Sequence, residues 1–129
     1  MAGEALRRQG RFDDARRWCD LAASGAAADD PATHIQVGAT RASIYAATGD
    51  PAAALEHAEA SARLVAGTDS PEFRADVAVA RADALAAAGR RDEARITLDT
   101  ATAELDAKGN VARARQLRRL RQELRPSRG

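Results

Sequence analysis

The sequence predicts an all-α fold: an α-solenoid of about three antiparallel helical hairpins, closed by a C-terminal capping helix. The first observation is a short motif, a glycine followed five residues later by an alanine, which begins at Gly10, Gly49 and Gly89. These glycines are 39 and 40 residues apart, and a fixed period of this size in a helix-forming sequence is typical of stacked helical hairpins. The second observation is that the last two copies align without a gap over residues 37–49 and 77–89.

Local signals at the ends of the helical runs set the expected boundaries. Three runs begin where a side chain that can cap a helix precedes a proline, which suits the first helical turn; the pairs are Asp30-Pro31, Asp50-Pro51 and Ser70-Pro71. Four runs are followed by a glycine, which can adopt the positive φ that ends a helix; these are Gly10, Gly49, Gly89 and Gly109. We therefore expect helices over residues 2–9, 12–24, 31–48, 51–66, 71–88, 91–107 and 111–124.

The first expected hairpin is incomplete, because its leading helix is shorter than those of the other two. Its outer face would lack a neighbour, which either further repeats of a longer array or a partner would cover. The last helix has the features of a cap, since arginines cover its surface around one apolar stripe; the stripe is Val111, Ala114, Leu117, Leu120 and Leu124. We expect a single domain over residues 1–129, with repeats at about 1–30, 31–70 and 71–108 and a capping helix at 110–125.

Composition indicates a thin core and an uneven charge. Apolar residues make up 45% of the chain but aromatic residues only 3%, so alanine, which buries little area per side chain, must fill much of the core. The net charge of +1 conceals a division: residues 1–107 hold 12 Lys+Arg and 18 Asp+Glu, whereas residues 108–129 hold 8 and 1. Such asymmetry indicates either an interaction tail or a basic helix docked on an acidic body.

The sequence favours a cytoplasmic location. No apolar leader follows Met1, and no run approaches the ~20 apolar residues of a membrane-spanning helix. The single cysteine, Cys19, cannot form an intramolecular disulfide, which fits a reducing compartment. The heavy use of alanine and arginine suits a GC-rich bacterium.

The repeated positions resemble those of the tetratricopeptide repeat family, whose hairpins turn on a glycine with an aromatic or apolar residue two positions later and an alanine five later. Gly10, Phe12 and Ala15 fit this pattern, and Tyr45 occupies the tyrosine position of the leading helix. The period is nearer 40 than the roughly 34 residues of the standard repeat. The sequence is therefore most similar to the longer-period repeats of bacterial signal-transduction regulators, such as LuxR-type ATPase regulators and cyclase-linked ATPases. The resemblance implies an α-solenoid that binds a protein or peptide.

Arg41 and Arg81 stand one repeat apart, where the family usually has leucine. They either bind a carboxylate or phosphate through bidentate hydrogen bonds or pair with acids of a neighbouring helix, which their repeat equivalence favours. The predicted partner groove comprises Gln36, Arg41, Ser43, Tyr45, Asp76, Val79, Arg81 and Asp83. It lacks the lysine and asparagine clamp of chaperone-binding members of the family, so we do not expect binding to chaperone C-termini.

Arginines concentrate in the last helix, at Arg113, Arg115, Arg118, Arg119, Arg121 and Arg125. A solvated cap face is the favoured interpretation, followed by a docking surface for an acidic partner. Nucleic acid or an anionic membrane is less favoured, because the helix has no aromatic residue to stack on bases.

No group of residues has the spacing of a catalytic, metal or cofactor site. Neither His34 nor His57 has a close His or Cys companion in sequence, and Cys19 has no paired histidine to activate it. Acidic pairs lie at helix starts, where they interact favourably with the helix dipole; they are Asp13-Asp14, Asp29-Asp30 and Asp92-Glu93. We therefore expect no enzyme activity, no metal and no cofactor.

The sequence thus predicts a non-catalytic interaction module of a bacterial regulatory system, which binds a peptide or a partner helix. Two alternatives remain open. One is a sensor whose groove closes over a small molecule or peptide signal, with a pocket around Arg41, Tyr45 and Arg81. The other is a homodimer formed through residues 2–24, where large side chains such as Trp18 are available.

Overall fold

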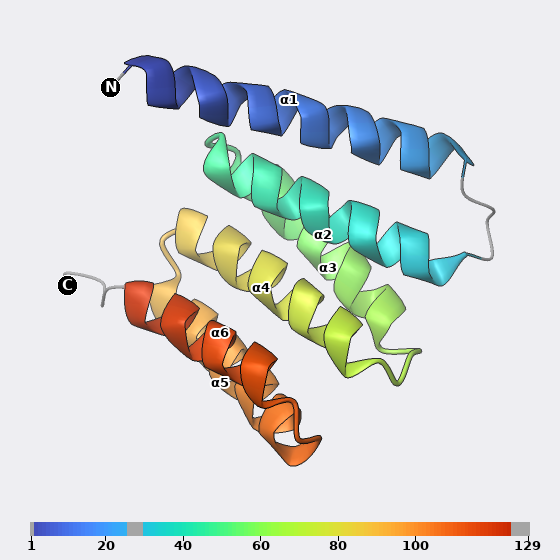
Figure 1. Ribbon diagram of the computed structural model, residues 1–129, viewed down its shortest axis with the longest axis vertical. Coiled ribbons are helices and arrows are strands. Elements are labelled where there is room, and N and C mark those ends of the chain that lie inside the picture. The colour runs from blue at the N-terminus through green and yellow to red at the C-terminus, as the bar shows by residue number, and fades with distance from the viewer. Residues whose placement is uncertain (1, 26–29, 125–129) are drawn as a thin grey trace.

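The computed structural model describes the backbone of residues 2–25 and 30–124, and the side chains of residues 11–25 and 30–124. Within these ranges every regular element is an α-helix, which confirms the predicted fold class. The helices are α1 (Ala2–Gly25), α2 (Pro31–Ala47), α3 (Pro51–Val65), α4 (Pro71–Ala87), α5 (Arg91–Ala107) and α6 (Val111–Glu123). They stack along the long axis of the molecule (Figure 1), as in a helical-repeat solenoid.

Two complete hairpins form the middle of the stack. Helix α2 packs against α3 and α4 against α5, and the hairpins meet through contacts of α4 with both α2 and α3. Helix α6 packs on α5 at one end of the array, whereas α1 lies against α2 at the other. In Figure 1, α2, α4 and α6 lie nearer the viewer than α3 and α5, so these three helices form one face of the stack.

The predicted turn at Gly10 is wrong, because residues 2–25 form one continuous helix. A glycine inside a helix costs about 1 kcal/mol relative to alanine. A separate leading helix of so few residues would be marginal by itself, so continuation of α1 through Gly10 is the less costly arrangement. The later turns do fall at the predicted glycines, since Gly49, Gly89 and Gly109 have φ angles of 89°, 81° and 78°.

Side-chain caps explain why the helix starts could be predicted. Four helices begin after a side chain that accepts a hydrogen bond from the backbone N–H three residues later, at 3.1–3.3 Å; these caps are Asp30, Asp50, Ser70 and Asn110. Such a bond satisfies one of the N–H groups that a helix start leaves unpaired. Helix α5 differs, because Arg90 precedes it and provides no side-chain cap.

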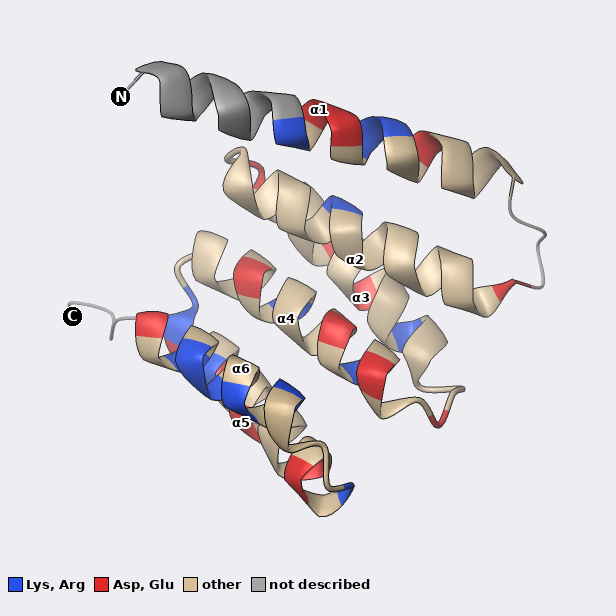
Figure 2. Ribbon diagram, in the orientation of Figure 1, with Lys and Arg blue, Asp and Glu red and all other residues tan. Residues whose placement is uncertain are grey.

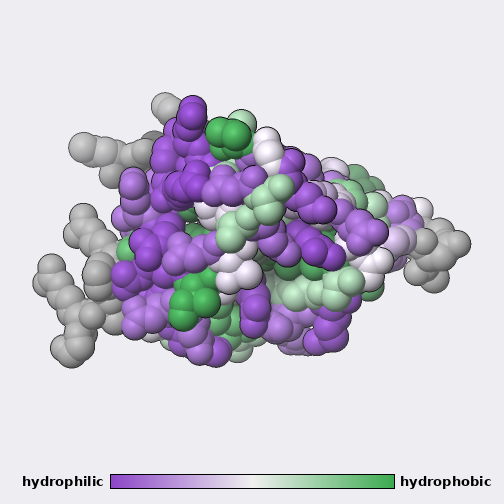
Figure 3. All heavy atoms as spheres, turned by 90° about the horizontal axis from the view of Figure 1, so that it is seen from below, coloured by the Kyte–Doolittle hydropathy of each residue, from purple (hydrophilic) through white to green (hydrophobic). Residues whose placement is uncertain are grey.

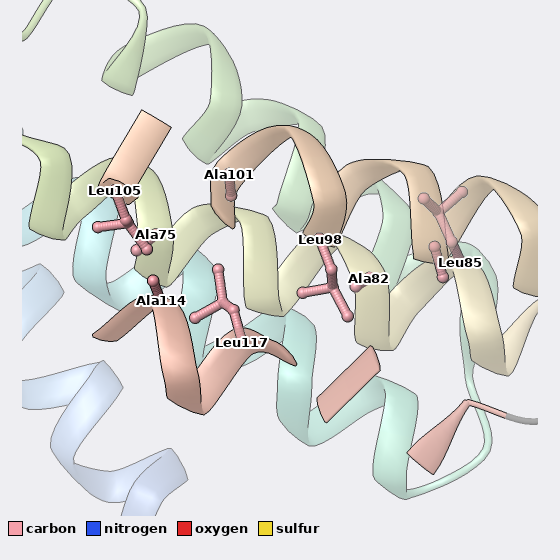
Figure 4. Close-up of a cluster of buried hydrophobic side chains, with 9 residues drawn as sticks. Ala75, Ala82, Leu85, Leu98, Ala101, Leu105, Ala114 and Leu117 are labelled. Atoms are coloured by element: carbon pink, nitrogen blue, oxygen red, sulfur yellow. The ribbon is translucent and has the colours of Figure 1, made fainter. Parts of the chain in front are cut away.

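The core is built mainly from alanine, as the composition predicts. Between α2, α3 and α4, one buried cluster consists of alanine alone, at positions 39, 42, 54, 58, 80 and 84. Larger side chains enter the core between α4, α5 and α6 (Figure 4); they are Leu85, Leu98, Leu105 and Leu117. Because small side chains let neighbouring helices approach closely, close packing fixes the relative positions of the helices that form each face.

Candidate partner-binding groove

Two hollows lie side by side on the face formed by α2, α4 and α6. The larger, of about 540 Å³, is lined by these three helices and by Arg91 at the start of α5. The second, of about 500 Å³, is lined by α2, α4, Arg113 of α6 and Trp18 of α1. Ser43 lines both hollows, so they adjoin at this residue, and we call the two hollows together the inner groove.

Alanines form much of the lining of the inner groove; they are Ala39, Ala46, Ala47, Ala80, Ala86 and Ala87. Four of them are equivalent in pairs, because positions 46 and 47 of α2 correspond to positions 86 and 87 of α4 one repeat later. Methyl side chains leave room for another chain to approach the helix backbones closely.

Polar groups enter the larger hollow at one repeated position. Ser43, Asp83 and Glu123 are spaced by 40 residues and lie on α2, α4 and α6. The Ser43 hydroxyl donates a hydrogen bond to Asp83 Oδ2 at 3.1 Å. Asp83 is exposed as a residue, but the walls of the hollow shield its carboxylate in part from water and raise its pKa, an effect that the Ser43 hydrogen bond partly offsets.

A second carboxylate of the groove, Asp76, is paired within the molecule. A guanidinium nitrogen of Arg113 lies 2.5 Å from Asp76 Oδ1 and links α6 to α4. Burial raises the pKa of Asp76, while the charge of Arg113 lowers it and that of Glu72 raises it further. Asp76 is thus already paired with a cation of the groove, whereas Asp83 forms no ion pair within the part of the chain that the structure describes.

Arg41 and Arg81 point away from the inner groove and pair with acids on the helix that precedes their own. Arg41 lies 3.1 Å from Asp20 of α1, and Arg81 lies 2.8 Å from Glu59 of α3. This arrangement is the pairing with a neighbouring helix that their repeat equivalence favours.

A third pair continues the series, because Arg121 of α6 lies 2.6 Å from Asp99 of α5. The three arginines are spaced by 40 residues, and their partners by 39 and 40. We call these three pairs the arginine ladder. Since Asp20 occupies the position of Glu59 and Asp99, α1 stands where the second helix of a preceding hairpin would stand.

Tyr45 also lies outside the two hollows. Its ring stacks on that of His57 of α3, with centroids 5.4 Å apart and planes inclined by 5°. A sensor pocket would need Arg41, Tyr45 and Arg81 around one cavity. Each of the three instead contacts a different partner on a neighbouring helix, so the structure does not bring them together.

The remaining predicted groove residues do line the two hollows; they are Gln36, Ser43, Asp76, Val79 and Asp83. Besides the six alanines, the sequence did not indicate the following groove residues: Trp18, Thr40, Arg91, Arg113, Glu123 and Leu124. Glu123 could have been found, because it lies 40 residues after Asp83. Trp18 gave no such signal, since its place at the groove depends on how α1 packs against α2.

The basic helix α6 is docked on acidic residues of the body. Besides the Arg113 and Arg121 pairs, Arg118 forms an ion pair with Asp106 of α5. Arg115 and Arg119 are exposed, and Arg125 lies outside the described residues. Figure 2 shows the basic residues gathered on α6 beside the acidic residues of α4 and α5.

Helix α6 also has the surface of a terminal helix. Ala42 and Ala82 are buried, but the equivalent residue of α6 is the exposed Gln122. Likewise the half-buried Val79 corresponds to the exposed Arg119. Seen from this end, hydrophilic residues cover most of the molecule (Figure 3). A polar outer face of this kind is what terminal helices of solenoids present to water.

His57 and the cysteine have packing roles. His57 stacks on Tyr45, and Cys19 is fully buried with Sγ 3.9 Å from the Val37 carbonyl oxygen. Burial raises the pKa of the Cys19 thiol, and the charge of Asp20 raises it further, while that of Arg41 lowers it; the net effect is a raised pKa. The reactive thiolate is therefore disfavoured. Over the described residues we find no cluster of three or more His, Cys, Asp or Glu that could hold a metal ion. Nor does any helix there combine the length and apolarity needed to cross a bilayer.

Comparison with known proteins gives one match. The family model described as tetratricopeptide repeat matches residues 1–20, 36–60 and 75–100. The matched segments fall in α1, in the α2–α3 hairpin and in the α4–α5 hairpin, which are the repeating parts of the fold. No curated protein and no solved structure matches the chain.

Proposed function

The chain belongs to the tetratricopeptide repeat family, whose repeats serve as protein-interaction modules, and on this premise we propose that its inner groove binds a peptide or helix of a partner protein. The interaction is non-catalytic: stacked hairpins supply a fixed surface, and the partner segment lies along it. We further propose that the module acts in a bacterial regulatory system in the cytoplasm, which the long repeat period and the single cysteine support.

The observation that carries this proposal is that the two hollows adjoin at Ser43 on one face of the stack. Both are open depressions on one face, and alanines from equivalent positions of two repeats form much of their lining. An elongated ligand can therefore contact α2, α4 and α6 together. Trp18 adds a half-exposed aromatic side chain at the α1 end, with 46% of its surface accessible. Large aromatic residues of this kind are frequent anchors of protein interfaces.

A groove-blocking substitution tests the proposal. Ala87 is exposed and lines the larger hollow, so Ala87→Trp should fill the groove without disturbing the core. Ala103→Trp is the matched control, because Ala103 is exposed on α5 and lines neither hollow. Peptides selected on the wild-type protein from a random library should bind Ala103→Trp and fail to bind Ala87→Trp. Equal binding to both variants would refute the inner groove as the binding surface.

Exposed apolar residues on α1 favour a second candidate function, self-association. Leu21 is 73% exposed and lies one turn from Trp18, and neither hollow is lined by Leu21. A second copy that covered this side of α1 would remove both side chains from water. Light scattering over a range of concentrations tests this: a dimer should dissociate in Leu21→Glu, whereas a wild-type protein that is monomeric at every concentration excludes it.

A further inference from the structure

We propose that the segment bound in the inner groove is basic, and that one of its lysine or arginine side chains lies against Asp83 and Glu123. This inference rests on the proposed function, because it specifies the chemistry of the partner that the groove receives. It follows from the charges in the larger hollow and from which of them are already paired.

Asp83 and Glu123 face the same hollow from α4 and α6. Among the described residues, neither carboxylate forms an ion pair, and the hydrogen bond that Asp83 accepts comes from the neutral hydroxyl of Ser43. By contrast, the carboxylates of Asp76, Asp20, Glu59 and Asp99 all lie against arginines of adjacent helices. The two carboxylates of the larger hollow are therefore available to a cation from outside.

The carboxylate of Asp83 would gain from a cation beside it. The walls of the hollow desolvate its carboxylate, and a carboxylate withdrawn from water is unfavourable until a positive charge or further hydrogen bonds compensate it. A bound lysine or arginine would supply that charge. Its long aliphatic stem would lie along the methyl groups of Ala86 and Ala87, which line the same hollow.

The other charges of the groove do not cancel its preference for a basic segment over an acidic one. Arg91 lines the larger hollow, so two carboxylates there face one guanidinium and a net negative charge remains. In the second hollow, Arg113 and Asp76 neutralise each other. An acidic segment would meet the two unpaired carboxylates, whereas a basic segment meets one arginine.

Selection from a random peptide library, displayed on phage, tests this inference together with the proposed function. Three variants are compared with the wild-type protein: Ala87→Trp, which blocks the groove; the double variant Asp83→Asn/Glu123→Gln, which removes both charges with little change in shape; and Glu56→Gln as the control. Glu56 is exposed on α3 and lines neither hollow. Asparagine at position 83 can still accept the hydrogen bond from Ser43.

We expect the peptides whose binding is lost in Ala87→Trp to be enriched in lysine and arginine. Their affinity should fall about tenfold in the double variant at low salt and remain unchanged in Glu56→Gln. Groove-dependent peptides without basic residues, or with full affinity for the double variant, would overturn the basic partner and leave the proposed function intact. Failure to select any groove-dependent peptide would contradict both.

Discussion

Gly38 of α2 lies directly against Ser61 of α3, so closely that a methyl group on Gly38 would be 2.1 Å from Ser61 Oγ. Ser61 is buried, and its hydroxyl donates a hydrogen bond to the Ile35 carbonyl oxygen at 3.1 Å. At this contact between the two helices of the first complete hairpin, α2 provides no side chain and α3 provides a hydroxyl. It also explains a glycine in the middle of a helix, where glycine is otherwise unfavourable.

Gly38→Ala should destabilise the protein by about 1 kcal/mol. Ser61 would have to rotate and lose its buried hydrogen bond, which costs about 1–3 kcal/mol, while alanine returns about 1 kcal/mol of helix propensity. In a Ser61→Ala background the clash with Oγ is absent, so the same substitution should be neutral or stabilising. Urea unfolding of the four proteins measures this coupling. Equal effects of Gly38→Ala in the two backgrounds would contradict the proposed contact.

Arg90→Asn should stabilise the protein, because α5 begins without a side-chain cap, whereas α2, α3, α4 and α6 each have one. A new cap adds about 1 kcal/mol to the free energy of unfolding. Loss of the exposed Arg90–Glu93 ion pair subtracts only about 0.5 kcal/mol or less. Asn110→Ala is the reciprocal control and should cost about 1 kcal/mol, since it deletes an existing cap. Thermal unfolding of both variants decides the matter; an unchanged or lower melting temperature in Arg90→Asn contradicts it.

Cys19 should react slowly with a thiol reagent, because its side chain is buried between α1 and α2 and its thiol pKa is raised. The reference is an exposed cysteine, Ala103→Cys, placed in a Cys19→Ala background. Under native conditions the wild-type thiol should react at least about tenfold more slowly, at a rate set by the opening of α1. In denaturant the two rates should converge. Comparable native rates would show that α1 does not stay packed on α2.

Asp83→Asn should stabilise the protein at neutral pH and have little effect in acid. Burial raises the pKa of the folded carboxyl above its unfolded value of 3.8, so the native state binds the proton more tightly than the unfolded state. Stability is therefore lost as pH rises from the unfolded to the folded pKa, and the variant escapes that loss. Unfolding free energies of the two proteins should coincide below pH 3.8 and separate above it. A difference that does not change with pH would contradict a raised pKa.

The bounds of α2–α6 could be predicted because their signals are local. A capping side chain before proline, or a glycine with positive φ, acts within a few residues of the helix end. Gly10 shows the limit of such reasoning, since the same residue type ends a helix at Gly49 and continues one in α1. The two glycines differ in the length of the helical segments on either side of them, and in whether each segment has a neighbouring helix to pack against.

The groove was only partly predictable for a different reason. Repeat spacing identified Ser43 and Asp83 as equivalent, and the structure shows them hydrogen-bonded. The same spacing cannot say whether Arg41 faces the groove or the neighbouring helix, because that depends on which side of α2 lies against α1. The position of Trp18 beside the second hollow likewise follows from tertiary packing and has no repeat equivalent to indicate it.

The arginine ladder has a consequence for how such an array changes in length. The Arg81–Glu59 pair lies wholly within one block of residues, 50–89, which begins at a cap and ends at a turn glycine. A tandem duplication of that block would carry its own ladder pair, its own cap and its own turn. The solenoid, and the inner groove with it, can therefore lengthen by two helices at a time, because each added block already contains the residues of its own helix–helix interface.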